Sequence, residues 1–240
     1  YGLDKAPPSA SLDEASIGYN AFSILKTGAD EYGTKFPILL RAYDDWRPAL
    51  YVYLVIPFVK VFGLNVLSVR LPSVILSILT VIAVYFLVKE IFKKSVFSVQ
   101  CSVFSIFLLA ISPWHIYISR LGHEVNAGLA FFIFAMLFSF HKKASLAAIF
   151  FLLSFISYQS EKIFIPLMIL GMAIIYRKEL FNQWKKIILI SLLSFIVLTP
   201  FFKETLQPNA LIRFKGTSIL EARKEELAGK IGLERRFLMG

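Results

Sequence analysis

Three short polar stretches of the sequence carry side chains that could do chemistry on a substrate. They are Ser11–Glu14, Arg120–Glu124 and Tyr158–Lys162. The first of these stretches ends in two adjacent carboxylates, Asp13 and Glu14. A carboxylate can take a proton from an attacking hydroxyl or amine as a general base. A guanidinium or an ammonium group can neutralise a phosphate. These residue types therefore offer acid–base chemistry and phosphate binding.

The Ser11–Glu14 stretch has two interpretations, which are compatible with each other. Its Ser-x-x-Glu pattern is that of a capping box, in which Ser11 and Glu14 close the start of a helix. In the other interpretation, Asp13 projects from this helix start as a general base. The helix would run to about Lys26 and end at Gly28. Its apolar residues share one face, as in an interfacial helix: Ala15, Tyr19, Phe22 and Leu25.

Two further acidic stretches precede the apolar part of the chain. Asp30–Gly33 has the composition of a turn, with solvated carboxylates. In Asp44–Pro48, Trp46 and Arg47 could anchor the chain at the level of lipid headgroups. Alternatively, the planar guanidinium of Arg47 could bind the phosphate of a lipid-linked ligand. The sequence leaves both interpretations of Arg47 open.

The Arg120–Glu124 stretch lies between two apolar blocks. Ionisable residues at the mouth of a membrane helix are costly unless they are solvated or paired, which makes them candidates for function. Arg120 and Glu124 are four residues apart and could form a helical ion pair. His123 and Glu124 are candidate metal ligands, although adjacent residues on a helix point in different directions. Tyr158–Lys162 is either a polar loop or a hydroxyl and ammonium cluster for a phosphate.

The composition indicates which elements hold these residues. Of the 240 residues, 57% are hydrophobic and 18% are charged, whereas soluble domains have about 45–50% apolar and about 25% charged residues. The sequence therefore predicts an all-α membrane protein, a polytopic transmembrane helical bundle. A helix needs roughly 20 residues to cross a bilayer, and several apolar blocks reach this length only when their flanking residues are included. The blocks are 49–63, 71–88, 96–118, 125–140, 144–157, 163–176 and 187–202.

The basic residues indicate the orientation of this bundle. The net charge is +10, and Lys and Arg cluster in Lys89–Lys94, Lys142–Lys143 and Arg177–Lys186. Basic loops of membrane proteins face the cytoplasm, so we expect Arg120–Asn126 and Tyr158–Lys162 on the extracytoplasmic side. Short charge clusters between apolar blocks suit lipid headgroups and not the phosphate backbone of a nucleic acid. We therefore expect membrane lipid, and no nucleic acid, as a partner.

The predicted organisation has three parts. Residues 1–70 form an extracytoplasmic first loop with juxtamembrane helices, and residues 71–202 form the transmembrane bundle, with about six crossings. Residues 203–240 begin a later extracytoplasmic loop. Block 49–63 is short and contains Pro57, so we expect it to lie at the interface. Sequence is expected to be missing at both ends.

Several motifs resemble a known family when they are taken in order. They are Pro7–Asn20, Lys26–Gly33, Arg47–Tyr51, Arg70–Ser73 and Ile111–His115. Their order and spacing resemble the protein O-mannosyltransferase and lipid A aminoarabinose transferase group of membrane glycosyltransferases, which have the GT-C fold. The resemblance covers the chain from residue 7 to about residue 215.

The resemblance implies an enzyme that moves a sugar from a polyprenyl-phosphate donor to an acceptor in a single inverting step. The acceptor could be a protein, a lipid or a glycan. The enzyme would be an integral protein of a prokaryotic plasma membrane, with its active site on the extracytoplasmic side. The resemblance implies no particular cofactor, and a divalent metal is compatible with the family. Trp46 stands where some relatives have an acidic residue, which argues against a metal site that uses this position.

The resemblance also implies roles for individual residues. The catalytic carboxylate falls on Asp13, with Glu14 beside it. A second acidic position falls on Glu124, where it would orient the acceptor or the surroundings of Asp13. The candidates for binding the donor phosphate are basic: Arg47, Lys162 and Arg120.

A non-enzymatic membrane protein is the alternative. A polyprenyl-lipid carrier, flippase or transporter component would also have apolar helices, basic loops and a phosphate clamp. Transporters usually place their charges near the bilayer midplane, within broken helices. In this sequence the apolar blocks are nearly free of ionisable residues, and the charges gather at their ends. This distribution favours chemistry at the rim of the bundle.

Overall fold

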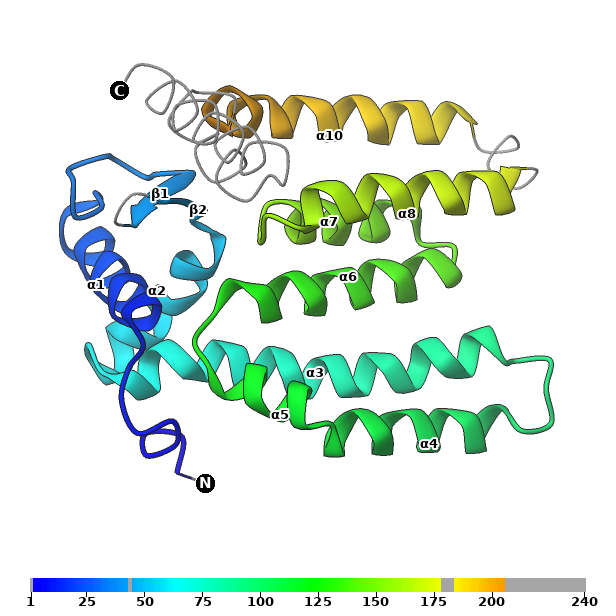
Figure 1. The fold of residues 1–240 in the computed structure, drawn as a ribbon. Helices are drawn as coiled ribbons and strands as arrows, with labels where there is room; N and C mark the ends of the chain where they lie inside the picture. The colour runs from blue at the N-terminus through cyan, green and yellow to red at the C-terminus, as the bar shows by residue number, and fades with distance from the viewer. Residues whose placement is uncertain (1, 43–44, 178–183, 206–240) are drawn as a thin grey trace, which may run out of the picture.

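The computed structural model describes residues 2–42, 45–177 and 184–205. Long helices lie side by side as parallel and antiparallel rods, and a smaller unit covers one end of them (Figure 1). We call this smaller unit the head; it comprises α1, α2 and the strands β1 and β2. The described part of the chain is mostly helical, as predicted.

Helix α1 (Leu12–Thr27) begins and ends as the sequence predicts. The Glu14 N–H donates to Ser11 Oγ (3.2 Å), and the Ser11 N–H donates to Glu14 Oε2 (2.9 Å), which completes the capping box. Gly28 ends the helix with a φ of 73°, a left-handed conformation that glycine adopts without steric cost. Of the predicted apolar face of α1, Tyr19 is exposed, whereas Phe22 and Leu25 are partly buried against the core of the head. The interfacial position of α1 stays a prediction.

The turn after α1 is confirmed, but one of its carboxylates is buried. Asp30 accepts hydrogen bonds from the N–H groups of Tyr32 (3.0 Å) and Thr34 (2.8 Å) through the same oxygen. Its exposed fraction is 6%, so the expectation of solvated carboxylates is wrong for Asp30. Because these hydrogen bonds satisfy the carboxylate, burying it costs less free energy than burying a carboxylate without partners.

A short β-hairpin follows, which corrects the all-α prediction for this segment. Strand β1 (Leu39–Ala42) pairs antiparallel with β2 (Asp45–Pro48), and Leu40 lies opposite Arg47. Strands of four residues are too short to show a clear alternation of polar and apolar side chains, and Pro48 argues against a strand in sequence. The hairpin is important for the site because β2 carries Arg47.

Helix α2 (Leu50–Phe62) packs against α1 and fills the core of the head. Val52 and Val55 are buried, and the Tyr51 hydroxyl donates to the carbonyl of Val69 (2.8 Å). Val61, near the end of α2, is exposed. An outward apolar side chain is compatible with an interfacial helix, and the interfacial position of block 49–63 stays a prediction.

Helix α3 (Val66–Ile91) extends from the head along the whole bundle (Figure 1). The Asn65 side chain caps it by accepting from the Ser68 N–H (2.9 Å). At 1.5 Å per residue, roughly 30 Å of helix separates Arg70 from Lys89, which is about the thickness of the hydrocarbon core of a bilayer. Among the residues described, α3 is the one unbroken helix that is long and apolar enough to cross a membrane.

Helices α4 (Ser98–Ile111) and α5 (Pro113–Arg120) return along α3. They meet at a bend of 59° and together are apolar enough for a second, broken span. Pro113 at the first position of α5 allows the new helix to start at the bend. Large apolar side chains of this pair are exposed, with Phe104 at 62% and Trp114 at 76%, as contact with lipid would explain.

Four further apolar helices complete the described bundle: α6 (Glu124–Phe140), α7 (Ala144–Phe155), α8 (Glu161–Ile175) and α10 (Trp184–Thr205). Helix α6 has 17 residues, α7 has 12 and α8 has 15, whereas a helix needs at least roughly 17 residues to cross a bilayer. The predicted six crossings therefore stay a prediction. Part of the Arg177–Lys186 cluster and most of the predicted loop 203–240 lie outside the described residues.

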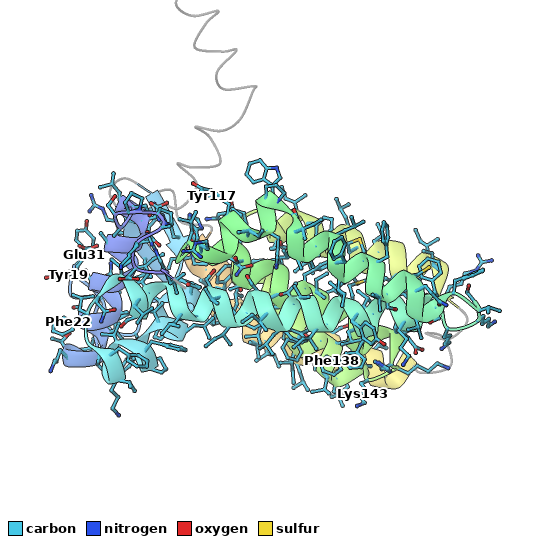
Figure 2. The ribbon with its side chains drawn as sticks, turned by 90° about the horizontal axis from the view of Figure 1, so that it is seen from below. Tyr19, Phe22, Glu31, Tyr117, Phe138 and Lys143 are labelled. Atoms are coloured by element: carbon cyan, nitrogen blue, oxygen red, sulfur yellow. The ribbon has the colours of Figure 1, made fainter. Side chains whose placement is uncertain are left out.

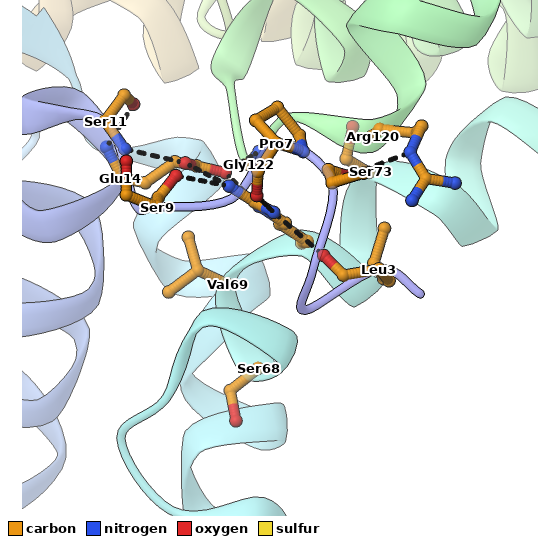
Figure 3. A network of polar contacts seen from close by, with 12 residues as sticks. Leu3, Pro7, Ser9, Ser11, Glu14, Ser68, Val69, Ser73, Arg120 and Gly122 are labelled. Carbon is orange, nitrogen blue, oxygen red and sulfur yellow. Dashed lines mark hydrogen bonds and ion pairs between the residues drawn. The ribbon is translucent and has the colours of Figure 1, made fainter. Parts of the chain in front are cut away.

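A fully buried guanidinium joins the head to the bundle. Arg70, in the second turn of α3, has an exposed fraction of 0%. Its Nε and Nη2 donate to the two carboxylate oxygens of Glu14 (2.6 and 2.9 Å). The remaining N–H groups donate to the carbonyls of Leu3, Pro7 and Ser9 at 2.8–2.9 Å (Figure 3). All five donors of Arg70 are thus satisfied by the segment before α1 and its first turn.

Two glycines allow other segments to approach the start of α3. A Cβ on Gly122 would lie 2.5 Å from Val69 Cγ1 and 2.8 Å from the Val69 carbonyl oxygen. A Cβ on Gly18, in α1, would lie 2.9 Å from Val69 Cγ2. The Gly122 N–H also donates to Glu14 Oε1 (2.9 Å). The loop between α5 and α6 therefore reaches the buried carboxylate because residue 122 has no side chain.

Replacing Arg70 by methionine should lower the free energy of unfolding by roughly 3–5 kcal/mol, because the Glu14 carboxylate would stay buried without its partner. Thermal unfolding in detergent measures this loss. Lys60→Met, at an exposed position of α2, is the control and should have little effect. Adding Glu14→Gln to Arg70→Met should recover part of the stability. Equal unfolding temperatures for Arg70→Met and Lys60→Met would contradict the role of Arg70.

Glycine-to-alanine substitutions at two positions should have opposite effects. Gly122→Ala should destabilise the protein, by roughly 1–3 kcal/mol, because its Cβ meets the backbone of Val69. Gly171→Ala, inside α8 with nothing within 4 Å of the new Cβ, should stabilise by up to about 1 kcal/mol, because alanine favours the helix. The unfolding temperatures of the two variants check both signs. A neutral Gly122→Ala would mean that this close approach does not exist.

Candidate functional site

Asp13 lies where three segments of the chain meet at one end of the bundle. Its Oδ1 is 2.5 Å from Arg47 Nη2, and its Oδ2 is 3.2 Å from His123 Nε2. The first turn of α1, strand β2 and the loop before α6 each contribute one of these residues. The Asp13 side chain is 34% exposed and that of Arg47 is 14% exposed. The carboxylate is therefore held between two nitrogen groups and stays accessible from outside.

The ionisation of Asp13 is controlled by its neighbours. Partial burial raises its pKa, but the hydrogen bond and charge of Arg47 and the contact with His123 together outweigh burial. As a result, the pKa of Asp13 lies below its ordinary value of 3.8. Asp13 is thus a carboxylate, and a proton acceptor, at any physiological pH.

Glu14 has a different environment from Asp13, although the two are adjacent. It is 2% exposed, and its oxygens accept hydrogen bonds from Arg70, Gly122 and Ser11. Burial raises its pKa, and these donors outweigh burial and lower it below 4.5. Consecutive residues of a helix point about 100° apart. Glu14 therefore points into the protein and holds the segment that carries Asp13.

Arg47 reaches Asp13 from the inner side of the hairpin. It lines a narrow crevice between α1, β1, β2 and α2 together with Tyr51 and Glu124, and the crevice, of about 10 Å³, has room for about one water molecule. The opposite edge of β2 is tied to the turn before α8, because Gln159 Nε2 donates to the Trp46 carbonyl (3.1 Å). The hairpin is thus held on both sides.

His123 lies between the two acidic candidates. Its Nδ1 is 3.2 Å from Glu124 Oε2, without the alignment of a hydrogen bond, and its Nε2 faces Asp13. Glu124 is the first residue of α6 and is 3% exposed. The sequence predicted Asp13 and Glu124 as members of one site, and a single imidazole contacts both.

These residues do not form a metal site as they are placed. Asp13 and Glu124 contact opposite nitrogens of the His123 ring, so the three side chains do not converge on a common point. The described residues also contain no group of three or more His, Cys, Asp or Glu side chains suited to a metal ion.

The remaining basic candidates lie around this site in different ways. Arg120 donates through Nε to the Ala6 carbonyl (2.9 Å) and through Nη2 to the Gly2 carbonyl (2.8 Å). It therefore holds the segment before α1. Lys162, in the first turn of α8, lies with its ammonium group 4.8 Å from the centre of the Phe201 ring. Gln159, three residues earlier, links this turn to the strand of Arg47.

The sequence-based assignment gave no role to Arg70, the residue that fixes the geometry of the site. It appeared in the motif Arg70–Ser73 without a function. A signal was available, because an arginine at the start of a long apolar block is costly unless it is paired. Its partner Glu14 is 56 residues away in the chain, and the spacing of residues does not reveal contacts over such distances.

A comparison with protein families identifies the family of this chain. The sequence profile of the dolichyl-phosphate-mannose-protein mannosyltransferase family matches residues 46–202. The match includes Arg47, Glu124 and Lys162, while Asp13 and Glu14 precede it. No curated protein and no solved structure matches the chain. Since the matched residues make up more than half of the sequence, the chain belongs to the dolichyl-phosphate-mannose-protein mannosyltransferase family, and it is a membrane glycosyltransferase.

Proposed function

We propose that this protein transfers a sugar from a polyprenyl-phosphate donor to an acceptor at the extracytoplasmic face of a prokaryotic plasma membrane, and that Asp13 is the general base. The observation that carries this proposal is the contact of Asp13 with Arg47, at 2.5 Å, on the end of an apolar helical bundle. An accessible carboxylate and a cation for phosphate, side by side, are what this transfer needs.

The proposed reaction is a single displacement that inverts the anomeric carbon. Asp13 takes the proton of an acceptor hydroxyl or amine as that atom forms a bond to the anomeric carbon. The bond from the anomeric carbon to the phosphate oxygen breaks, and its electron pair leaves with polyprenyl phosphate. Arg47 neutralises the charge that develops on this leaving group.

The contact between Asp13 and Arg47 implies an order of events. In the free protein Arg47 lowers the pKa of Asp13, which makes the carboxylate a weak base. A donor phosphate competes for the same guanidinium, and its binding would draw Arg47 away from Asp13 Oδ1. The pKa of Asp13 would then rise towards its ordinary value, so donor binding would activate the base.

His123 and Glu124 support this role of Asp13. With Oδ2 held by His123 at 3.2 Å, Oδ1 is the oxygen that becomes available when Arg47 moves. Glu124, buried behind His123, would orient the imidazole. Lys162 would approach the phosphate from the turn that Gln159 ties to β2. Arg120 and Glu14 would act through the segment they hold, since their hydrogen bonds go to it.

The position of the site fits a membrane enzyme of the GT-C type. Asp13, Arg47 and His123 lie at the end where α3 begins, and the predicted cytoplasmic lysines lie at the other end. The exposed apolar side chains of α3, α4, α8 and α10 would face lipid in a bundle of about six crossings. A polyprenyl chain could then remain in the bilayer while its phosphate reaches Arg47.

Asp13→Asn should reduce sugar transfer by about 10²–10⁴-fold, because the amide cannot accept the proton of the acceptor. The measurement is transfer of radiolabelled sugar from polyprenyl-phosphate donors in membranes that contain the full-length protein, at equal protein levels. Asp4→Asn, at an exposed position before α1, is the matched control and should retain activity. Full activity of Asp13→Asn would show that the base is another residue.

Arg47→Gln should raise the KM for the donor by roughly 10- to 100-fold, because a hydrogen bond to a charged phosphate is lost. Arg41→Gln, on the paired strand of the same hairpin, removes an equal charge next to the site and should leave this KM nearly unchanged. Steady-state kinetics with varied donor concentration separate the two variants. Equal changes in both would mean that the hairpin contributes only general positive charge.

A further inference from the structure

The end of the bundle opposite to Asp13 contains a hollow that the proposed reaction does not use. Figure 2 shows Phe138 and Lys143 at this end, far from Tyr19, Phe22 and Glu31 of the head. The hollow lies between the end of α3, the start of α4 and the end of α6, and its volume is about 510 Å³. This size is in the range of small-molecule sites, about 300–1,000 Å³.

The polar lining of the hollow favours an anion. Three basic residues contribute to it: Lys89 on α3, Lys93 in the loop after α3, and His141 directly after α6. The one carboxylate in the lining, Glu90, is 2.5 Å from Lys93 Nζ, so the charges of these two side chains offset each other. With Lys89, the lining keeps a net positive charge. The Lys89 ammonium lies 5.9 Å from the centre of the Tyr85 ring.

Small polar groups complete this side of the hollow. Ser95 and Ser98 both line the hollow. The Ser98 hydroxyl donates to the Lys89 carbonyl (3.1 Å), whereas the Ser95 hydroxyl accepts from the Phe97 N–H (3.2 Å) and can itself donate to a ligand. Helix α4 begins at this point, and no side chain caps its start. The Ser98 N–H donates to the Ser95 carbonyl (3.2 Å), and the N–H groups that follow it in the first turn point in the direction that anions prefer. The basic side chains and these donors together match a phosphate group.

The apolar lining continues into two exposed stripes. Phe86 and Val99 line the hollow beside the lysines. From Phe86, exposed side chains recur every four residues along α3, and from Val99 they do so along α4. Residues four apart lie on one face of a helix. The stripes lead away from the lysines along the bundle: Phe86 (48% exposed), Ile82 (49%) and Ile78 (57%), and Val99 (49%), Val103 (51%) and Phe107 (57%).

We propose that this hollow binds the headgroup of an anionic glycerophospholipid, with the phosphate at Lys89 and Lys93 and an acyl chain along the stripe that begins at Phe86 and Val99. A free phosphate would use the lysines but not the apolar residues that line the same hollow. A zwitterionic lipid would use the stripes but would gain little from the lysines. The anionic lipid uses both, and it does not depend on the catalytic assignment of Asp13.

The test compares two pairs of lysines at the same end of the protein. Lys89→Gln with Lys93→Gln removes the cations of the hollow. Lys142→Gln with Lys143→Gln removes the same charge from the exposed loop between α6 and α7, outside the lining of the hollow. The full-length protein is placed in nanodiscs of phosphatidylcholine with phosphatidylglycerol, and native mass spectrometry measures the phosphatidylglycerol retained per protein.

We expect the first pair to retain about tenfold less phosphatidylglycerol than the wild type, since each lysine near an anionic lipid contributes a several-fold factor in affinity. The second pair should change retention by less than about twofold. Equal losses in both pairs would mean general attraction to a charged surface and would overturn the proposal. Unchanged retention in both would overturn it as well.

A second measurement separates the lipid from a free phosphate. Inorganic phosphate and glycerol 3-phosphate are added to the wild-type protein in detergent, beside long-chain phosphatidylglycerol, and the unfolding temperature is recorded. Stabilisation by the lipid alone, lost in the Lys89→Gln and Lys93→Gln variant, supports the proposal. Equal stabilisation by inorganic phosphate would assign the hollow to a soluble anion, and the apolar stripes would have no part in binding.

Discussion

The buried ion pair between Arg70 and Glu14 is the constraint on which the rest of the structure depends. A guanidinium with no exposure is stable only when its donors are satisfied, and Glu14 with the carbonyls of Leu3, Pro7 and Ser9 satisfies all five. The segment before α1 therefore has one position against α3. Since Asp13 precedes Glu14 directly, its position on the end of the bundle follows from the same pair.

The two adjacent carboxylates divide their tasks because a helix turns about 100° per residue. Glu14 points inwards and is enclosed by Arg70, Gly122 and the start of α1. Asp13 points to the side, where Arg47 and His123 arrive from distant parts of the chain. The buried carboxylate supplies rigidity, and its neighbour supplies an accessible oxygen. Exchanging the residue types at positions 13 and 14 would lose either the hydrogen bonds of Glu14 to Arg70 and Gly122 or the contacts of Asp13 with Arg47 and His123.

The sequence predicted those parts of the site that local physics determines. The capping box and the Gly28 end of α1 involve residues close together in the chain, and both are confirmed. The hairpin was missed because its strands are short and depend on burial against the head. The contact of Asp13 with His123 joins residues 110 apart. A resemblance to a family placed Asp13 and Glu124 in one site, and the sequence named His123 as a candidate metal ligand. Only the fold shows that the His123 ring lies between the two carboxylates.

The two ion pairs at this end, Arg70 with Glu14 and Arg47 with Asp13, differ in burial and therefore in the free energy needed to separate them. Breaking a buried pair by removing one partner costs roughly 3–5 kcal/mol, whereas partly exposed pairs are worth about 0–1 kcal/mol. Arg70 has no exposure and no donor to spare, so a phosphate could not recruit it. Arg47 is partly exposed, and its partner Asp13 is more exposed. When the two separate, water can form hydrogen bonds with both side chains in place of the lost ion pair. In the proposed reaction, a donor phosphate would therefore draw on Arg47 while Arg70 keeps Asp13 in place.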